Sequence, residues 1–186
     1  HNTWLKSMKG KITIEGPVHF AMIKIGFNDV EIFDKHKSRG ILQIKGNVIF
    51  RGKASIGHGS KVSVYGDIIF GNNFFITAET SIISAKKIVF GDNCLISWEN
   101  LIMDTDFHKI IDASGRGINP NKEIIIGNNV WIGCRCTILK GTIIADNTVV
   151  AANSCLHGKI GNGNQIIGGN PTSVLKDNIK WEVNLN

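Results

Sequence analysis

The residues best suited to chemistry lie in one short polar segment, 103–108. His108 stands there with two carboxylates, Asp104 and Asp106, within four residues. A neutral imidazole can accept a proton near neutral pH, and a nearby carboxylate can fix its tautomer and stabilise the imidazolium. The pattern predicts that His108 is a general base and that Asp104 or Asp106 orients its ring.

An aliphatic or aromatic residue returns every six residues along most of the chain, and the series is Phe50, Ile56, Val62, Phe70, Ile76, Ile82, Phe90, Ile96, Ile102, Ile126, Ile132, Ile138, Ile144, Val150 and Leu156. A period of six fits neither a helix nor a simple strand and indicates short strands joined by tight corners, with three hexads in each triangular coil. Each coil exposes hydrogen-bonding edges that only another coil satisfies. We therefore expect about eight parallel coils, stacked ~4.8 Å apart, whose chain direction never reverses.

The repeat is interrupted once. It stops after Ile102 and restarts at Ile126, so a long loop is inserted at about 104–124. A polar excursion from a rigid scaffold is a common location for function. The interruption therefore strengthens the prediction that His108 is a general base.

The remaining features favour one elongated domain over residues 1–186, with coils at about 11–175 and a tail at 176–186. We expect Trp181 in the tail to pack over the last coil, because an open strand edge invites aggregation. The basic segment 33–40 is interpreted as a solvated turn, with contact to a phosphate or an acceptor as the alternative. No apolar run reaches about 18 residues and no signal-like start is present, so the prediction is a cytoplasmic protein without a membrane span.

The net charge and the cysteines indicate which classes of ligand the protein could bind. The net charge of +6 has no run of like charges, which suits a phosphate-bearing ligand better than duplex nucleic acid. Four cysteines are present, at positions 94, 134, 136 and 155, without a C-x-x-C pair. Cys94 and Cys136 each lie four residues after an apolar hexad residue, at a position where the repeat otherwise has small side chains. We interpret the cysteines as small core residues of a reducing compartment, and expect neither a metal nor a disulfide.

Several segments carry a resemblance to a known family, namely 126–133, 138–141, 150–154 and 168–171. Together they resemble the hexapeptide-repeat acyltransferases, in the branch of galactoside, maltose and serine O-acetyltransferases and polysaccharide O-acetyltransferases. The resemblance covers roughly 50–176. It implies an all-β fold, a left-handed parallel β-helix, and a homotrimer with active sites between subunits. The hand rests on the resemblance alone, because the general crossover rule favours the opposite hand.

The same resemblance implies roles for individual residues. His108 would take a proton from an acceptor hydroxyl as its oxygen attacks the thioester of acetyl-CoA. The implied substrate-binding residues are Thr77, Trp98, Glu99 and Asn100. Thr77 stands where galactoside-type members have an Asn, which argues against galactoside-like acceptors. Asn100 is at a position of its hexad whose side chain is expected to point into the column. The implied cofactor-binding residues are Trp131, Gly133, Cys134, Ala151, Ala152, His157 and Lys176.

The predicted function is O-acetylation of a sugar hydroxyl in bacterial surface polysaccharide or lipopolysaccharide biosynthesis. Serine O-acetylation and nucleotide-sugar N-acetylation are alternatives in the same class. A non-catalytic trimeric scaffold is another. A carbonic-anhydrase-like zinc site would need three converging imidazoles, whereas His58, His108 and His157 are isolated in the sequence and His58 is predicted to face outward.

Overall fold

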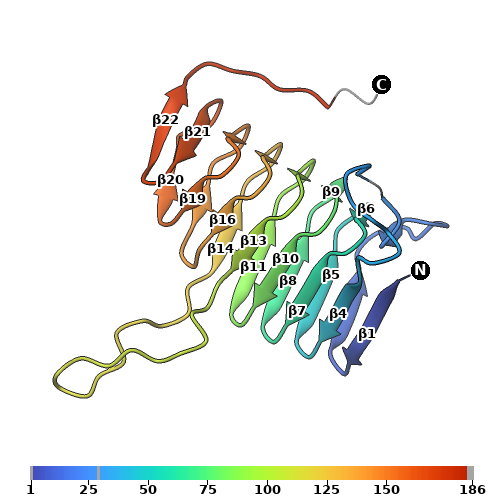
Figure 1. Ribbon diagram of the computed structural model, residues 1–186, viewed down its shortest axis with the longest axis horizontal. Coiled ribbons are helices and arrows are strands. Elements are labelled where there is room, and N and C mark those ends of the chain that lie inside the picture. The colour runs from blue at the N-terminus through green and yellow to red at the C-terminus, as the bar shows by residue number, and fades with distance from the viewer. Residues whose placement is uncertain (1, 29, 184–186) are drawn as a thin grey trace.

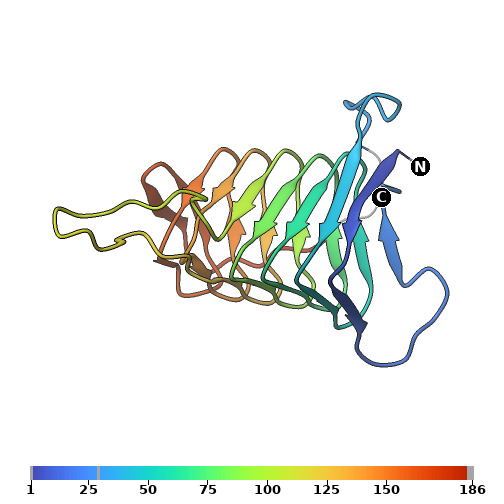
Figure 2. The ribbon, with the colours of Figure 1, turned by 90° about the horizontal axis from the view of Figure 1, so that it is seen from below.

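The strands form a three-sided column, with the inserted loop projecting from one side (Figure 1). The computed structural model describes residues 2–28 and 30–183. Three strands make one coil, and Figure 2 shows successive coils stacked along the column. No helix that could cross a bilayer occurs within those residues.

Each side of the column is one sheet, and the chain visits the three sheets in turn. The first sheet contains β1 (Thr3–Met8), β4 (Gly40–Ile44), β7 (Lys61–Val64), β10 (Ser81–Ser84), β13 (Leu101–Met103), β16 (Thr137–Ile138) and β19 (Cys155–Leu156). The second contains β2 (Lys11–Ile14), β5 (Asn47–Phe50), β8 (Asp67–Phe70), β11 (Lys87–Phe90), β14 (Ile124–Ile126), β17 (Ile143–Ile144) and β20 (Lys159–Ile160). The third contains β3 (Ile23–Ile25), β6 (Ala54–Ile56), β9 (Phe74–Ile76), β12 (Leu95–Ile96), β15 (Trp131–Ile132), β18 (Val149–Val150), β21 (Ile166–Gly169) and β22 (Thr172–Lys176).

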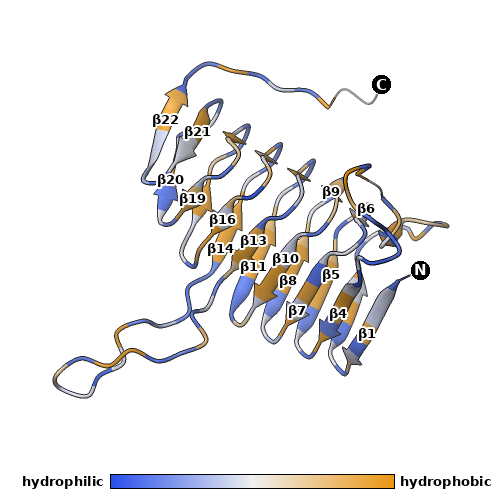
Figure 3. Ribbon diagram, viewed as in Figure 1, coloured by the Kyte–Doolittle hydropathy of each residue, from blue (hydrophilic) through white to orange (hydrophobic). Residues whose placement is uncertain are grey.

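The core lies inside the column and consists of the predicted hexad residues. Every member of the series from Phe50 to Leu156 is buried, because side chains alternate along a strand and only one face points inward. Figure 3 shows the apolar residues gathered along the strands. Equivalent residues stack on one another, as the rings of Phe50, Phe70 and Phe90 do at 5.1 and 5.6 Å between centroids. The six-residue period therefore predicted these core residues correctly.

Three expectations about the column are wrong. Its strands begin at Thr3 rather than near Lys11, because β1 pairs with β4, and the first two sheets contain seven strands each, giving seven coils rather than about eight. The chain direction also reverses once, since β22 runs antiparallel to β21. This antiparallel strand covers the terminal edge of the third sheet, which the next coil would otherwise have to satisfy.

The C-terminal tail does not pack over the last coil as predicted. Because β22 already occupies the sheet edge, the tail turns back along the outer face of the third sheet (Figure 1). Trp181 donates a hydrogen bond of 2.8 Å to the carbonyl oxygen of Asn129, and its ring lies 5.9 Å from that of Trp131. Further along, Val183 lines a small apolar hollow with Phe75 and Leu95. The tail thus covers an outward apolar row.

His58 is buried, at 5% exposure, and the prediction that it faces outward is wrong. Its Nδ1 lies 2.8 Å from the carbonyl oxygen of Asn28, and its ring packs against Phe33 at 5.8 Å. Both partners come from the irregular segment between β3 and β4, which covers this corner of the column. Cys94 and Cys136 are buried in the core, as their position in the repeat predicted, whereas Cys134 and Cys155 are half-buried.

Candidate active site

The inserted loop leaves the column at the corner between the first and second sheets, which we call the first corner. β13 ends at Met103 and β14 begins at Ile124, so the loop occupies the predicted region. It folds back on itself, with an antiparallel bridge between Ile111 and Gly117 and a hydrogen bond of 2.9 Å from the amide of Ile118 to the carbonyl of Ile110. The excursion is thus a narrow arm whose two sides run together to its base.

His108 lies at the base of this arm and is exposed. Its amide donates to the carbonyl of Asp106 at 2.7 Å, and Phe107 between them has a φ of 60°. This is a tight three-residue turn of the rare positive-φ type, which is strained for a bulky residue. His108 lines a hollow of about 370 Å³ together with Thr105, Phe107, Lys109, Gly117, Asn119, Pro120 and Asn121. The strained turn therefore presents the imidazole to a solvent-accessible recess.

Asp104, predicted as a possible partner of His108, has a different role in the structure. Its carboxylate is fully buried and accepts hydrogen bonds from the amides of Ala85, Lys86 and Lys87 at 2.6 to 2.9 Å. Ser84 Oγ lies 3.1 Å from the same carboxylate. The amide of Ala85 meets Oδ1, and the amides of Lys86 and Lys87 meet Oδ2. The geometry therefore assigns Asp104 to fastening the loop base to the preceding coil.

Asp106 is held by two other side chains rather than by His108. Its carboxylate pairs with the ammonium group of Lys140 and accepts a hydrogen bond of 2.8 Å from Asn119 Nδ2. The hydrogen bond from Lys140 first, and that from Asn119 second, lower the pKa of Asp106. Lys140 lies at the first corner of the next coil, so this pair fastens the loop base to the column from the other side.

The expected hydrogen bond between a carboxylate and the His108 ring is therefore not present among residues 2–28 and 30–183. Instead, Asn119 holds the backbone of His108: Nδ2 donates 2.8 Å to its carbonyl, while Oδ1 accepts 2.6 Å from the amide of Ile110. Sequence reasoning did not identify Asn119 as a site residue. The available signal was its position in the returning side of the inserted loop.

The predicted substrate-binding residues gather at the corner between the third and first sheets, which we call the third corner. Glu99 is exposed and forms an ion pair of 2.7 Å with Arg135 on the next coil. Asn100 faces inward as predicted, and both ends of its amide are hydrogen-bonded: Nδ2 donates 2.8 Å to the carbonyl of Ser97, and Oδ1 accepts 2.7 Å from the amide of Cys136. The bond from Cys136 joins two coils, and the two bonds together favour a structural role for Asn100.

The two other predicted acceptor residues, Thr77 and Trp98, are half-buried at the same corner. Thr77 Oγ1 is buried and has no hydrogen-bond partner in the described chain. The Trp98 carbonyl accepts a hydrogen bond of 3.0 Å from the amide of Arg135. All four predicted acceptor residues thus share one edge of the column, and none lies on the arm that carries His108.

The predicted cofactor residues divide into two groups. Trp131 lies on the outer face of the third sheet, and Gly133, Cys134, Ala151 and Ala152 follow at the third corner. A residue with a side chain does not fit at Gly133, because a β-carbon there would lie 2.7 Å from the amide nitrogen of Ala152. His157 lies instead at the first corner, after β19, and Lys176 ends β22. A single chain therefore does not bring all seven together.

Comparisons with known proteins agree with this architecture. Residues 123–158 match the sequence profile of the family described as bacterial transferase hexapeptide (six repeats). The polysialic acid O-acetyltransferase of Neisseria meningitidis is 38% identical over 81 residues, which are 43% of this chain and 38% of that protein. The chain thus spans well under half the length of this relative.

Two solved structures share the fold. The crystal structure of the polySia-specific acetyltransferase NeuO superposes with a TM-score of 0.72 at 19% identity, covering 98% of this chain and 73% of that one. A galactoside acetyltransferase in complex with coenzyme A gives 0.59 at 24% identity, covering 73% and 72%. The column is therefore a left-handed parallel β-helix of hexapeptide repeats, and the resemblance to hexapeptide-repeat acyltransferases is confirmed.

Proposed function

We propose that the protein is an acetyl-CoA-dependent O-acetyltransferase acting on a sugar hydroxyl, in bacterial surface polysaccharide or lipopolysaccharide biosynthesis. The observation that carries the proposal is the exposed imidazole of His108, which a strained turn and Asn119 hold at the base of the inserted arm. The similarity to a polysialic acid O-acetyltransferase supports the choice of a polysaccharide acceptor.

In the proposed reaction, His108 removes the proton from an acceptor hydroxyl as its oxygen attacks the thioester carbonyl. The carbon–sulfur bond then breaks, the acetyl group remains on the sugar oxygen, and the imidazolium returns its proton to the departing thiolate of CoA. Backbone N–H groups would stabilise the oxyanion of the intermediate. No covalent enzyme intermediate is needed, and none of these steps requires a metal.

The third corner has the features that a linear cofactor needs. Gly133 cannot carry a side chain, Ala151 and Ala152 are small, and the exposed ring of Trp131 borders the corner. The coenzyme A complex of a galactoside acetyltransferase of the same fold supports acetyl-CoA as donor. In this proposal the pantetheine arm lies along these residues, with Cys134 and His157 beside it and Lys176 near a phosphate.

The proposed assembly is a homotrimer with active sites between subunits. Its support is geometric: His108 lies on an arm from the first corner, whereas the acceptor and cofactor residues lie mainly at the third corner, so a neighbouring copy would complete the site. An outward row of aliphatic side chains on the second sheet offers apolar surface for such contacts, and it consists of Ile49, Ile69, Val89, Ile125 and Ile143. Light scattering on the purified protein tests the trimer.

Free cysteines and acetyl-CoA are both typical of the cytoplasm, and we propose that the reaction takes place there. The four thiols are unpaired in the fold, and none of the proposed roles requires their oxidation.

The decisive experiment is a thiol-release assay with acetyl-CoA and a panel of sugars, oligosaccharides and serine. His108→Ala should lower turnover by about two to four orders of magnitude, the usual contribution of a general base, while CoA binding is kept. His19→Ala, an exposed histidine outside the inserted loop, is the matched control. Full activity of His108→Ala would refute the mechanism, and turnover with serine alone would assign a serine O-acetyltransferase instead.

A further inference from the structure

The N-terminal end of the column carries the whole charge excess of the chain. Residues 1–60 contain ten Lys or Arg against four Asp or Glu, whereas residues 61–186 contain eleven of each. The irregular segment 27–39 is neutral by itself, with three basic and three acidic residues. The excess therefore belongs to the first two coils, which have seven basic residues and only Glu15 as an acidic one, and Glu15 pairs with Arg51 at 3.4 Å.

Four lysines surround the end of the column. They come from all three sheets, namely Lys6 on β1, Lys9 and Lys11 around the start of β2, and Lys24 on β3. All four side chains are exposed, and none of them forms an ion pair with another described residue. Such a group of unpaired cations creates a positive potential that attracts an anionic surface.

The same end exposes the apolar interior of the column. Leu5 and Ile12 pair in register with Leu42 and Val48 of the next coil. Leu42 and Val48 are only 6% and 2% exposed, whereas Leu5 and Ile12 are 59% and 44% exposed. Leu5 and Ile12 thus occupy core positions, but no further coil covers them within the part of the chain that the structure describes. The column end is therefore an apolar face bordered by lysines.

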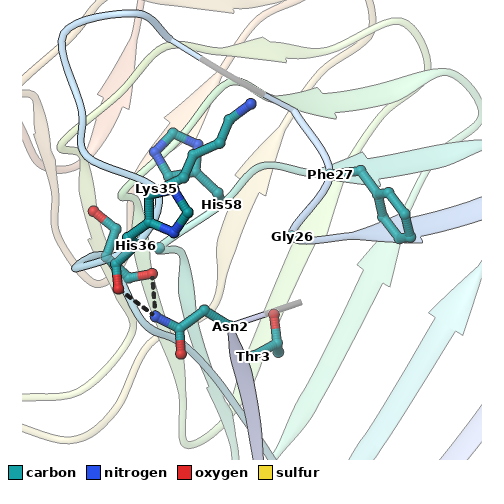
Figure 4. Close-up of a pocket in the computed structure, with 9 residues that line it drawn as sticks. Asn2, Thr3, Gly26, Phe27, Lys35, His36 and His58 are labelled. Carbon is teal, nitrogen blue, oxygen red and sulfur yellow. Dashed lines mark hydrogen bonds between the residues drawn. The ribbon is translucent and has the colours of Figure 1, made fainter.

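The irregular segment 27–39 lies beside this end rather than over it. Asn2 Nδ2 donates to the carbonyls of His36 and Ser38 at 3.4 and 3.1 Å, which fastens the segment to the start of β1 (Figure 4). A hollow of about 500 Å³ separates this segment from the turn after β3. The neutral segment therefore neither covers the apolar face nor cancels the charge around it.

An apolar loop extends beyond the end of the column. Figure 1 and Figure 2 both show the connection between β2 and β3 reaching past the first coil. Phe20 in this loop is 100% exposed, and Val18 is 68% exposed. Large apolar side chains that stand so far out from a soluble surface indicate a contact with another apolar phase or partner.

We infer that this end of the column docks on a membrane surface that contains anionic lipids. Phe20 and Val18 enter the boundary between headgroups and acyl chains, and the surrounding lysines contact the lipid phosphates. A nucleic acid would use the lysines but would leave the apolar side chains in water. A second copy of the chain, placed end to end, would bring two positive surfaces together. A bilayer surface with negative headgroups satisfies both features at once.

Docking by this end would set the height of the proposed active site above the membrane. The arm leaves the column after β13, which is four strands from β1 in the first sheet. At ~4.8 Å per strand, the base of the arm stands about 20 Å from the docked end. If the proposed function holds, His108 acts on acceptor groups that are presented at about this height.

The test is sedimentation of the full chain with lipid vesicles, in the absence of acetyl-CoA. The wild type should bind phosphatidylglycerol vesicles, with an affinity that falls as salt is added, and should bind phosphatidylcholine vesicles about tenfold more weakly or less. Phe20→Ser should lower the partition coefficient by about tenfold, because one phenylalanine side chain no longer leaves water. Ile118→Ser, which removes an exposed apolar side chain on the inserted arm, is the matched control.

A second pair of variants tests the charge. Lys9→Gln combined with Lys24→Gln should lower the affinity for phosphatidylglycerol vesicles by about tenfold or more. Lys159→Gln combined with Lys180→Gln removes the same charge from exposed positions outside the first two coils and is the control. Thermal melting shows whether each variant is folded.

Failure of the wild type to bind phosphatidylglycerol vesicles would overturn the inference. Unchanged binding by Phe20→Ser would also overturn it, because charge alone would then explain the adsorption. Binding of soluble polyglutamate without binding of vesicles would assign the surface to an acidic protein instead. Because the assay contains no acetyl-CoA, each of these results is independent of the acetyl transfer proposed above.

Discussion

Asn119 Nδ2 lies 2.8 Å from the carbonyl oxygen of His108 and 2.8 Å from Asp106 Oδ2, so one amide group holds both the backbone of the proposed base and its neighbouring carboxylate. Lys140 completes the arrangement, because its ammonium group contacts Asp106 and donates 3.0 Å to the carbonyl of Asn119. The position of His108 is therefore controlled from the opposite side of the arm and from the adjacent coil.

We predict that Asn119→Ala lowers kcat by about tenfold or more, because a small misplacement of a catalytic group is costly, while the KM for acetyl-CoA is unchanged. Steady-state kinetics with both substrates measure this difference. Ile118→Ala, an exposed neighbour of Asn119 whose side chain does not line the recess, is the control. A parallel rise in the KM for acetyl-CoA would show that Asn119 acts on cofactor binding instead.

The pH range in which the arm stays fastened follows from Asp106. Lys140 and Asn119 lower the pKa of this carboxylate below 3.8, so its contribution is complete above the ordinary value and is lost as the pH falls through the lowered one. Hydrogen exchange of peptides from 105–121, corrected for its intrinsic pH dependence, should therefore show constant protection from pH 8 down to about 4. Opening of the arm between pH 7 and 5 would contradict this assignment.

Asp104 should matter for stability more than for the chemical step. Asp104→Ala leaves three backbone amides without their buried acceptor, and we expect the free energy of unfolding to fall by roughly 3 kcal/mol. Urea denaturation measures the change, and Glu123→Ala, which removes an exposed carboxylate just before β14, is the matched control. Unchanged stability together with an altered pH–rate profile would instead favour the ring-orienting role predicted from the sequence.

Cys94 should resist thiol reagents in the folded protein. Burial raises its pKa from 9.0 to about 12, so the reactive thiolate is far scarcer at pH 8 than for an ordinary cysteine. Half-buried Cys134 should react faster, and acetyl-CoA should protect it if the third corner binds the cofactor. Mass spectrometry after timed alkylation distinguishes the two sites, and rapid labelling of native Cys94 would contradict the packing described above.

The sequence predicted the column well and the details of the site poorly, for a physical reason. Burial of a residue such as Phe70 or Ile132 follows from a period of six, which is a local property. The contacts of Asp104 depend on where a long insertion returns to the column, and no local pattern fixes that path. His58 illustrates the same limit, because its burial results from an irregular segment that crosses a corner which the repeat alone leaves open.

The register between coils has a consequence for how such a chain can change in evolution. Phe50 pairs with Phe70 and Phe70 with Phe90, always one coil apart and always at the same place in the sheet. A duplicated or deleted coil would meet the same neighbours on both sides, so the column could lengthen or shorten without redesign of its interior. The distance between the N-terminal end of the column and the inserted arm would then change in steps of ~4.8 Å.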